Sequence, residues 1–455
     1  MKKEYLKIDK VIGPLIEMSG VTDVSYGELV DIKENDGTIK NGKIIKIKED
    51  NVVIQVFENT SGLSTSNASI SFKNEAFELP LSKDILGRTF DGLGRPIDAG
   101  GDIFSRKKYN INGRPINPVA RKYPRDFIQT GISSIDGLMT LIRGQKLPIF
   151  SGNGMPHNEL ASQIIRQAKL GDGSKEDFAI VFAAIGVKHD DADFFRKSLI
   201  EANAMDRVVM FVNYANDPIA ERINTPRCAL TAAEYLAFEE NMEILVVMSD
   251  ITSYCEALRE VSSAKEEVPS RKGYPGYLYS DLASLYERAG MLKDKPGSIT
   301  FLPILTMPND DITHPIPDLT GYITEGQIVL GRELFQSNFY PPVNVLPSLS
   351  RLMKDGIGEG YTRSDHPDVA NQLFASYSKV QDIRSLAQIM GEDDLSEIDK
   401  KYMEFGRAFE SRFITQSPHE NRDINITLDL AWEILRILPK DSLTRLDPEL
   451  INQKY

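Results

Sequence analysis

The chain has 455 residues, of which 41% are hydrophobic and 26% are charged. This composition is typical of a soluble globular protein, and at roughly 150 residues per domain the length predicts about three domains. The formal net charge of −13 argues against nucleic acid or an anionic membrane surface as the main partner. We expect neither a membrane-spanning helix nor a signal peptide. The scattered histidines, with no CxxC or HExxH pattern, predict no dedicated metal site.

Residues 1–75 predict an all-β domain. Apolar and polar residues alternate along 43–48, a turn signal follows at Glu49-Asp50-Asn51, and an apolar run occupies 52–56. This pattern predicts a strand, a turn and a second strand. A small closed β-barrel accounts for several such strands in series.

Residues 76–345 predict an α/β domain. Short apolar runs alternate with helix-type segments, and the runs lie at 147–152, 178–186, 207–216, 244–250 and 299–308. Apolar strands that alternate with helices are typical of a parallel sheet covered by helices on both faces.

Residues 346–455 predict a helical domain. Ser396 with Asp399 resembles a capping box at the start of one helix, and a second helical segment ends at Pro439. Five apolar residues of the first helix fall on one face: Ile398, Tyr402, Phe405, Phe409 and Phe413.

The turn after the run at 147–150 has the position and glycine content of a phosphate-binding loop. A working loop needs GxxxxGK[ST], since its lysine neutralises phosphate charge and its hydroxyl holds Mg²⁺. Neither register, from Ser151 or from Gly152, supplies a lysine followed by Ser or Thr. The alternative is a simple glycine turn before a helix. The candidate phosphate contacts of this degenerate loop are Gly152, Gly154, His157 and Asn158.

Asp250 ends the apolar run at 244–250 and is a second candidate. A carboxylate at the end of such a strand resembles a Walker B aspartate, which would reach Mg²⁺. The alternative is a helix N-cap or another loop role, because many parallel strands end in Asp beside a helix.

The segment 341–351 reads PPVNVLPSLSR and carries the most specific resemblance. Its spacing is similar to the signature of the alternating head subunits of rotary ATPases. Further resemblance to that family covers all three predicted domains, and segments 274–290 and 310–327 resemble the B-type, non-catalytic subunits of V/A-type rotary ATPases. The segments outside the signature that resemble the family are 87–98, 127–152, 274–290, 310–327 and 390–399.

The resemblance implies a role for Arg351, which directly follows the signature. In B-type subunits this arginine is a finger that reaches the nucleotide site of the neighbouring subunit, and a permanently charged, forked guanidinium suits phosphate oxygens. Ser348 and Ser350 would shape its loop. The alternative for Arg351 is a surface salt bridge.

One departure from the catalytic subunits decides between roles. Those subunits carry a glutamate, in a Gly-Glu-Arg setting, that orients or activates the attacking water. The corresponding position here is Val187, which cannot accept a proton. Since the loop lysine is missing as well, the resemblance implies the non-catalytic partner.

The resemblance therefore implies a β-barrel, a RecA-like α/β domain and a C-terminal helical bundle. It implies three copies alternating with three catalytic A-type subunits, in contact with central shaft and peripheral stalk subunits on the cytoplasmic face of a membrane. ATP or ADP with Mg²⁺ would bind at the interface with the catalytic subunit and would not be tightly held by this chain alone. The head would couple ATP hydrolysis or synthesis to H⁺ or Na⁺ transport. Two alternatives are a stand-alone RecA-like ATPase, of the export or translocase type, and a purely structural scaffold subunit.

Overall fold

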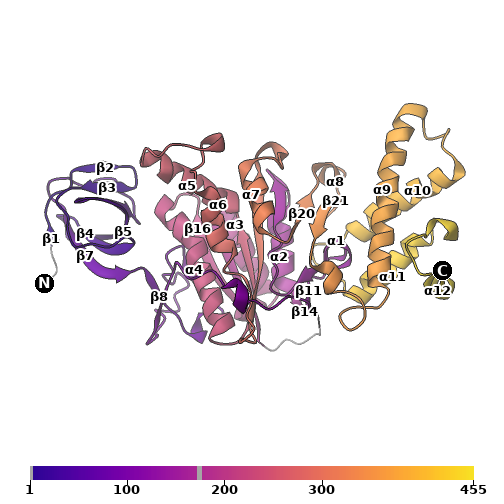
Figure 1. The fold of residues 1–455 in the computed structure, drawn as a ribbon, viewed down its shortest axis with the longest axis horizontal. Coiled ribbons are helices and arrows are strands. Elements are labelled where there is room, and N and C mark those ends of the chain that lie inside the picture. The colour runs from indigo at the N-terminus through magenta and orange to yellow at the C-terminus, as the bar shows by residue number, and fades with distance from the viewer. Residues whose placement is uncertain (1–3, 172–176) are drawn as a thin grey trace.

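The computed structural model describes residues 4–171 and 177–455, which form three consecutive domains along one axis (Figure 1). A small β domain lies at one end, a mixed sheet with its helices lies in the middle, and a group of helices lies at the other end. The order of the three classes along the chain is the predicted one, and the fold class is confirmed.

The N-terminal domain is a seven-stranded, curled antiparallel sheet with the order β1-β7-β4-β5-β6-β3-β2. Alternate residues such as Val30, Ile44 and Ile54 are fully buried inside it. The predicted strand-turn-strand is confirmed, since β5 and β6 pair on either side of Glu49-Asp50. The strands are Glu4–Tyr5 (β1), Lys10–Ile12 (β2), Leu15–Met18 (β3), Glu28–Lys33 (β4), Ile39–Lys48 (β5), Asn51–Val56 (β6) and Ser69–Ala76 (β7).

The middle domain contains a nine-stranded sheet with the order β21-β20-β13-β19-β17-β15-β16-β9, in which β18 also pairs with β19. Its strands run parallel, as predicted, except that β21 is antiparallel to β20 and β18 to β19. The strands are Thr89–Asp91 (β9), Ile149–Gly152 (β13), Phe178–Val187 (β15), Val208–Tyr214 (β16), Glu243–Ser249 (β17), Gly290–Met291 (β18), Ser298–Met307 (β19), Gly326–Leu330 (β20) and Val343–Ser350 (β21).

Helices cover both faces of this sheet, which is why its central strands are apolar throughout. In β15, Ile180 and Phe182 pack on the side of α2 and α3, whereas Val181 and Ile185 pack on the side of α4 and α5. Short strands around the sheet are Glu78–Pro80 (β8), Lys108–Asn110 (β10), Phe127–Gln129 (β11), Leu141–Ile142 (β12) and Lys169–Leu170 (β14). The helices are Ser133–Leu138 (α1), His157–Gln167 (α2), His189–Glu201 (α3), Ile219–Phe238 (α4), Ile251–Ala264 (α5), Leu278–Tyr286 (α6), Pro315–Ile323 (α7) and Arg332–Gln336 (α8).

The C-terminal domain is helical, as predicted. Ser396 caps α10 by accepting a hydrogen bond from the Asp399 backbone N–H at 3.2 Å. The predicted apolar face is buried at Phe405, Phe409 and Phe413, but a π-helical turn over Phe409–Ile414 replaces the last turns of the expected α-helix. The helices are His366–Met390 (α9), Glu397–Ala408 (α10), Ile424–Leu435 (α11) and Pro448–Lys454 (α12).

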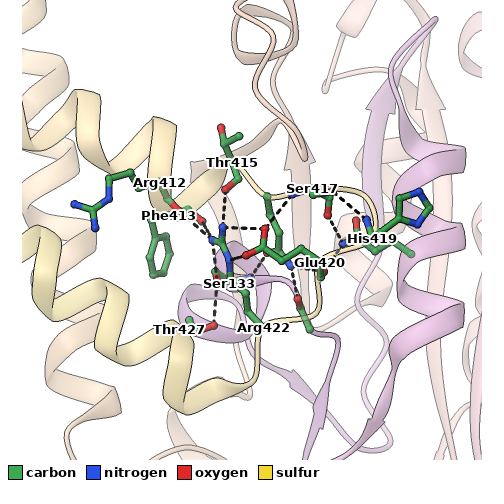
Figure 2. Close-up of polar contacts among 12 residues, drawn as sticks. Ser133, Arg412, Phe413, Thr415, Ser417, His419, Glu420, Arg422 and Thr427 are labelled. Atoms are coloured by element: carbon green, nitrogen blue, oxygen red, sulfur yellow. Dashed lines mark hydrogen bonds and ion pairs between the residues drawn. The ribbon is translucent and has the colours of Figure 1, made fainter.

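The segment between the π-helical turn and α11 attaches this domain to the middle one, as Figure 2 shows. Arg422 donates to the carbonyl oxygens of Arg412 at 3.0 Å and Thr415 at 3.1 Å, and its backbone N–H donates to the Gly131 carbonyl at 3.0 Å. Gln163 of α2 donates to the Glu420 carbonyl at 2.9 Å. The helix that follows the candidate phosphate loop is therefore fixed to the C-terminal domain.

His366 makes a second, pH-sensitive attachment at the start of α9. Its Nε2–H donates to the Gly137 carbonyl at 3.0 Å, so Nδ1 is left to accept from the Thr362 hydroxyl, also at 3.0 Å. Burial lowers the pKa of His366 to about 4. Between pH 6.5 and 4, His366 binds a proton in the unfolded state but stays neutral in the folded state. The stability that neutral His366 contributes to the folded state is therefore lost as pH falls from 6.5 to 4.

We expect the free energy of unfolding of the wild type to fall by about 3 kcal/mol more than that of His366→Gln between pH 6.5 and 4. Burial raises the pKa of Asp136 to about 7, so protonation of Asp136 increases stability as pH falls. Because Asp136 is present in the wild type and in His366→Gln, the difference between the two proteins isolates the effect of His366. Denaturant unfolding at several pH values measures the difference. The surface variant His419→Gln is the control and should track the wild type, and a pH-independent gap for His366→Gln would contradict the assignment.

Candidate functional site

A cavity of about 460 Å³ lies at the carboxyl end of the parallel strands β13, β15 and β17. This edge of a parallel sheet is where α/β proteins commonly bind ligands. The structure brings most of the sequence candidates together here, and those that line the cavity are Gly154, His157, Asn158, Val187 and Asp250.

Gly152 lies at the base of the loop, where a side chain would displace the ion pair of Asp310 and Arg332. A Cβ atom at this position would stand 2.0 Å from Asp310 Oδ1 and 2.6 Å from Arg332 Nη2. Arg332 Nη2 donates to Asp310 Oδ1 at 2.8 Å and to the Asn153 carbonyl at 3.0 Å. An ion pair of this chain thus holds the first half of the loop.

The second half of the loop leads into α2 without a cationic side chain. His157 begins the helix, and its Nδ1 lies 3.1 Å from the hydroxyl of Ser151. Met155 turns its side chain into the core beside α2. In the register that starts at Gly152, Asn158 stands where the lysine is expected, and its Oδ1 is buried without a hydrogen-bond partner among the described residues.

Asp250 acts as the N-cap of α5 in this structure. Its Oδ1 accepts hydrogen bonds from the backbone N–H of Thr252 at 2.8 Å and of Thr306 at 3.1 Å. These bonds fix the carboxylate at the cavity wall and join β17 to β19. The N-cap role and a Walker B-like role are compatible, since only one carboxylate oxygen is engaged by them.

Val187 is the last residue of β15 and lines the cavity while its side chain is buried in the core. No carboxylate projects from this position, which the sequence resemblance aligns with the water-orienting glutamate of catalytic subunits. The next residue, Lys188, is the N-cap of α3.

The charges around the cavity disfavour phosphate. Lys188 is the single lysine or arginine among the lining residues, against three carboxylates, those of Glu159, Asp191 and Asp250. A triphosphate carries several negative charges, so this balance repels it unless Mg²⁺ or another chain supplies positive charge.

Arg351 lies elsewhere, directly after the edge strand β21. Because β21 is antiparallel, Ser350 pairs with Gly326 at the first residue of β20, whereas the phosphate loop follows the opposite end of the neighbouring β13. Arg351 is exposed, and its Nη1 makes one long hydrogen bond of 3.4 Å to the Thr324 carbonyl. No carboxylate in the described part of the chain lies within 4.0 Å of its guanidinium.

The two serines of the signature hold the strand that presents Arg351. Ser348 Oγ accepts from the Val329 backbone N–H at 2.9 Å. Ser350 Oγ accepts from Gln145 Nε2 at 2.9 Å and donates to the Thr140 carbonyl at 3.0 Å. Both hydroxyls are buried, so they fix β21 rather than contact a ligand within this chain.

Sequence reasoning missed the residues that reach the loop from distant strands. Asp310 follows β19 and Arg332 follows β20. Asp310 begins the segment 310–327 that resembles B-type subunits, but the resemblance implies no role for it at the loop, and Arg332 lies outside the segments that resemble the family. Phe335 of α8 also lines the cavity. The one available signal was position, since each lies just beyond the carboxyl end of a strand predicted or found in the same sheet.

Residues 4–171 and 177–455 contain no group of three or more His, Cys, Asp or Glu side chains arranged to hold a metal ion. No helix in these ranges is long and apolar enough to cross a membrane.

Comparison with family models assigns a class to each part of the chain. The β-barrel domain of the ATP synthase alpha/beta family matches residues 8–74, and the nucleotide-binding domain of that family matches 131–350. The C-terminal domain of V and A type ATP synthase matches 355–455. The fold and the loop-bearing cavity are thus those of a head subunit of the ATP synthase alpha/beta class.

Individual relatives narrow the class. The V-type ATP synthase beta chain 2 of Clostridium tetani is 69% identical, with 100% of this chain and 99% of the relative covered. The V-type ATP synthase beta chain of Halothermothrix orenii is 62% identical over 100% and 98%. A solved structure, the ATP synthase subunit NeqB from Nanoarcheaum equitans, is 40% identical and superposes with a TM-score of 0.74 over 93% of this chain and 98% of that one. The chain belongs to the family of V-type ATP synthase beta chains.

Proposed function

We propose that this chain is the non-catalytic B subunit of a V/A-type rotary ATPase or ATP synthase, which completes the ATP site of a catalytic A-type neighbour with Arg351. Three copies alternate with three A-type subunits around a central shaft, braced by peripheral stalk subunits. The assembled head couples ATP hydrolysis or synthesis to H⁺ or Na⁺ transport from the cytoplasmic face of a membrane.

One contrast carries the proposal. The chain's own cavity is lined by His157 and Asn158, neither of which is the lysine that either register of the loop needs, and by Val187, which the sequence resemblance aligns with the water-orienting glutamate. Arg351, by comparison, is exposed and free of a carboxylate partner within the described ranges. A guanidinium in this state is available to another chain, whereas a surface salt bridge would have occupied it.

The contrast between the chain's own cavity and Arg351 also indicates where nucleotide binds. ATP or ADP with Mg²⁺ binds at the interface with the A-type subunit, which supplies the phosphate-binding lysine and the metal-binding groups. Arg351 contributes charge to the phosphate oxygens as the bond breaks, and the buried hydroxyls of Ser348 and Ser350 keep its strand in place. The cavity that is formed by the degenerate loop and Asp250 of this chain holds no nucleotide tightly.

We expect the purified chain alone to have no ATPase activity, because it lacks both a loop lysine and a residue to orient water. A coupled assay of ADP release, with the A-type partner added in a parallel reaction, measures this. Turnover of roughly 1 s⁻¹ or faster by the chain alone would favour a stand-alone ATPase and overturn the assignment of roles.

The variant Asn158→Ala is the matched control in the assembled complex. If the chain's own loop plays no part in turnover, this variant keeps the wild-type rate. The scaffold alternative makes a different prediction, since it requires that changes at Arg351 also leave the rate unaltered.

A further inference from the structure

A second cavity, of about 500 Å³, lies between the barrel and the middle domain, and no residue of the phosphate loop lines it. Its walls come from β5 and β6 of the barrel, from α4 and α6, and from the end of α5 and the residues after it. This volume is in the range of small-molecule sites in proteins. None of the residues discussed above for nucleotide chemistry lines it.

Two polar side chains enter this cavity from the barrel. Lys43 and Gln55 are direct partners in the β5–β6 register, while their neighbours Ile44 and Ile54 are fully buried in the barrel core. Because side chains alternate along a strand, Lys43 and Gln55 both point out of the barrel and towards α4. Both residues line the cavity.

The hydrogen bonds of these two side chains are incomplete. Lys43 Nζ donates to Asn224 Oδ1 of α4 at 2.8 Å, which is one of the three bonds that an ammonium can make. Gln55 is 2% exposed, and its Nε2 is buried without a partner among the described residues. A buried donor without an acceptor destabilises the folded protein, so an acceptor at this point would stabilise it.

The residues that line the cavity carry an excess of positive charge. Arg227 Nη2 pairs with Asp281 at 2.9 Å, and Lys265 pairs with Glu267 at 3.3 Å. The lining thus holds three cations against two carboxylates, and both carboxylates are engaged. Lys43 has no carboxylate within 4.0 Å in the described part of the chain. Burial, with repulsion from Arg227, lowers the pKa of Lys43 to about 8.

We propose that this cavity binds a small organic anion, whose carboxylate or phosphate group accepts hydrogen bonds from Lys43 and Gln55. The anion supplies the negative charge that the lining lacks and the acceptor that Gln55 lacks. Its apolar part packs against the hydrophobic wall of the cavity, which includes Ile45, Phe77, Ile223, Leu258 and Val261. A bound molecule contacts the barrel and the middle domain together, so it stabilises their attachment.

Two aromatic anions test the proposal, benzoate for a carboxylate and phenyl phosphate for a phosphate, with benzyl alcohol as the neutral match. We expect at least one anion to bind the full chain saturably in isothermal titration and to raise its melting temperature, while benzyl alcohol does neither. Binding by only one of the anions supports the proposal and identifies the head group.

The variants Lys43→Met and Gln55→Leu should each weaken anion binding about tenfold or more, since each removes one buried donor to the anion. Lys46→Met is the matched control, because Lys46 is an exposed lysine on the same strand and its loss should leave binding unchanged. Gln55→Leu leaves the Lys43–Asn224 bond in place and keeps the test valid if Lys43→Met loosens the two domains. Failure of both anions to bind, or equal binding by the wild type and both cavity variants, would overturn the proposal. The cavity would then be a water-filled space between the two domains.

Discussion

Arg351→Ala is expected to lower the turnover of the assembled complex by a factor on the order of 10³, the scale known for arginine fingers. Charge on the transferred phosphoryl oxygens is redistributed as the bond breaks, and a fixed guanidinium in a water-poor interface stabilises that state more than bound ATP. Turnover has to be measured per assembled complex, with the complex isolated and quantified before the assay.

The structure predicts that this variant still folds and assembles. Arg351 is exposed and makes a single long side-chain hydrogen bond of 3.4 Å within the chain. Substitutions at such positions usually change stability by less than about 0.5 kcal/mol. The strand that carries the residue is held by Ser348 and Ser350, which the substitution leaves untouched.

Arg351→Lys and Lys354→Ala separate the explanations. An ammonium is a point charge on a flexible stem, so Arg351→Lys should rescue little of the lost turnover. Lys354→Ala removes a nearby exposed cation and should leave turnover near the wild-type value. If Arg351→Ala and Arg351→Lys both keep wild-type turnover per complex, Arg351 is structural and the finger is another arginine.

The periodic parts of the fold were predictable because each pattern has one physical cause. Alternation along 43–48 reflects one face in the barrel core, and the apolar run at 52–56 reflects burial of β6 against the barrel core on one face and the middle domain on the other. The apolar run at 178–186 reflects burial on both faces of a sheet, and β15 has both. The π-helical turn over Phe409–Ile414 was not predictable, since its residues keep a helical apolar spacing.

The candidate cavity was predictable in outline. Gly154, Val187 and Asp250 lie at or just after the ends of three strands, and the parallel sheet brings them to one edge because the carboxyl ends of its strands coincide. The contacts that depend on side-chain geometry were not predictable from the sequence. Asp310 and Arg332, which lie more than 150 residues away at the ends of β19 and β20, approach Gly152, and no sequence pattern predicts that approach. The pairing of Lys43 with Asn224 across two domains is of the same kind.

Deletion of residues 1–75 is expected to abolish assembly of the hexameric head while leaving a folded remainder. The barrel core is a separate cluster of buried residues, and the large core of the middle domain on the side of α4 and α5 contains one buried barrel residue, Leu15. Removal of the barrel also takes away Ile45 and Val53, which pack against that core, and Phe57, which packs with Leu93 and Ala220, but the remaining buried residues of the core belong to the middle domain itself. Barrels of neighbouring head subunits would form a ring, so their loss removes contacts that every subunit makes with two neighbours.

The measurement is the mass of the complex formed with the A-type partner, by native mass spectrometry or light scattering, at matched concentrations of full-length and truncated chain. Far-UV circular dichroism and cooperative unfolding of the truncated chain are the necessary control, because deletion also exposes Phe77 and Ile223, which line the cavity between the domains. A truncated chain that is folded and does not assemble places the ring contacts in the barrel. A truncated chain that assembles at the same concentration as the full-length one would mean that the middle and C-terminal domains hold the ring, and that the barrel has another task.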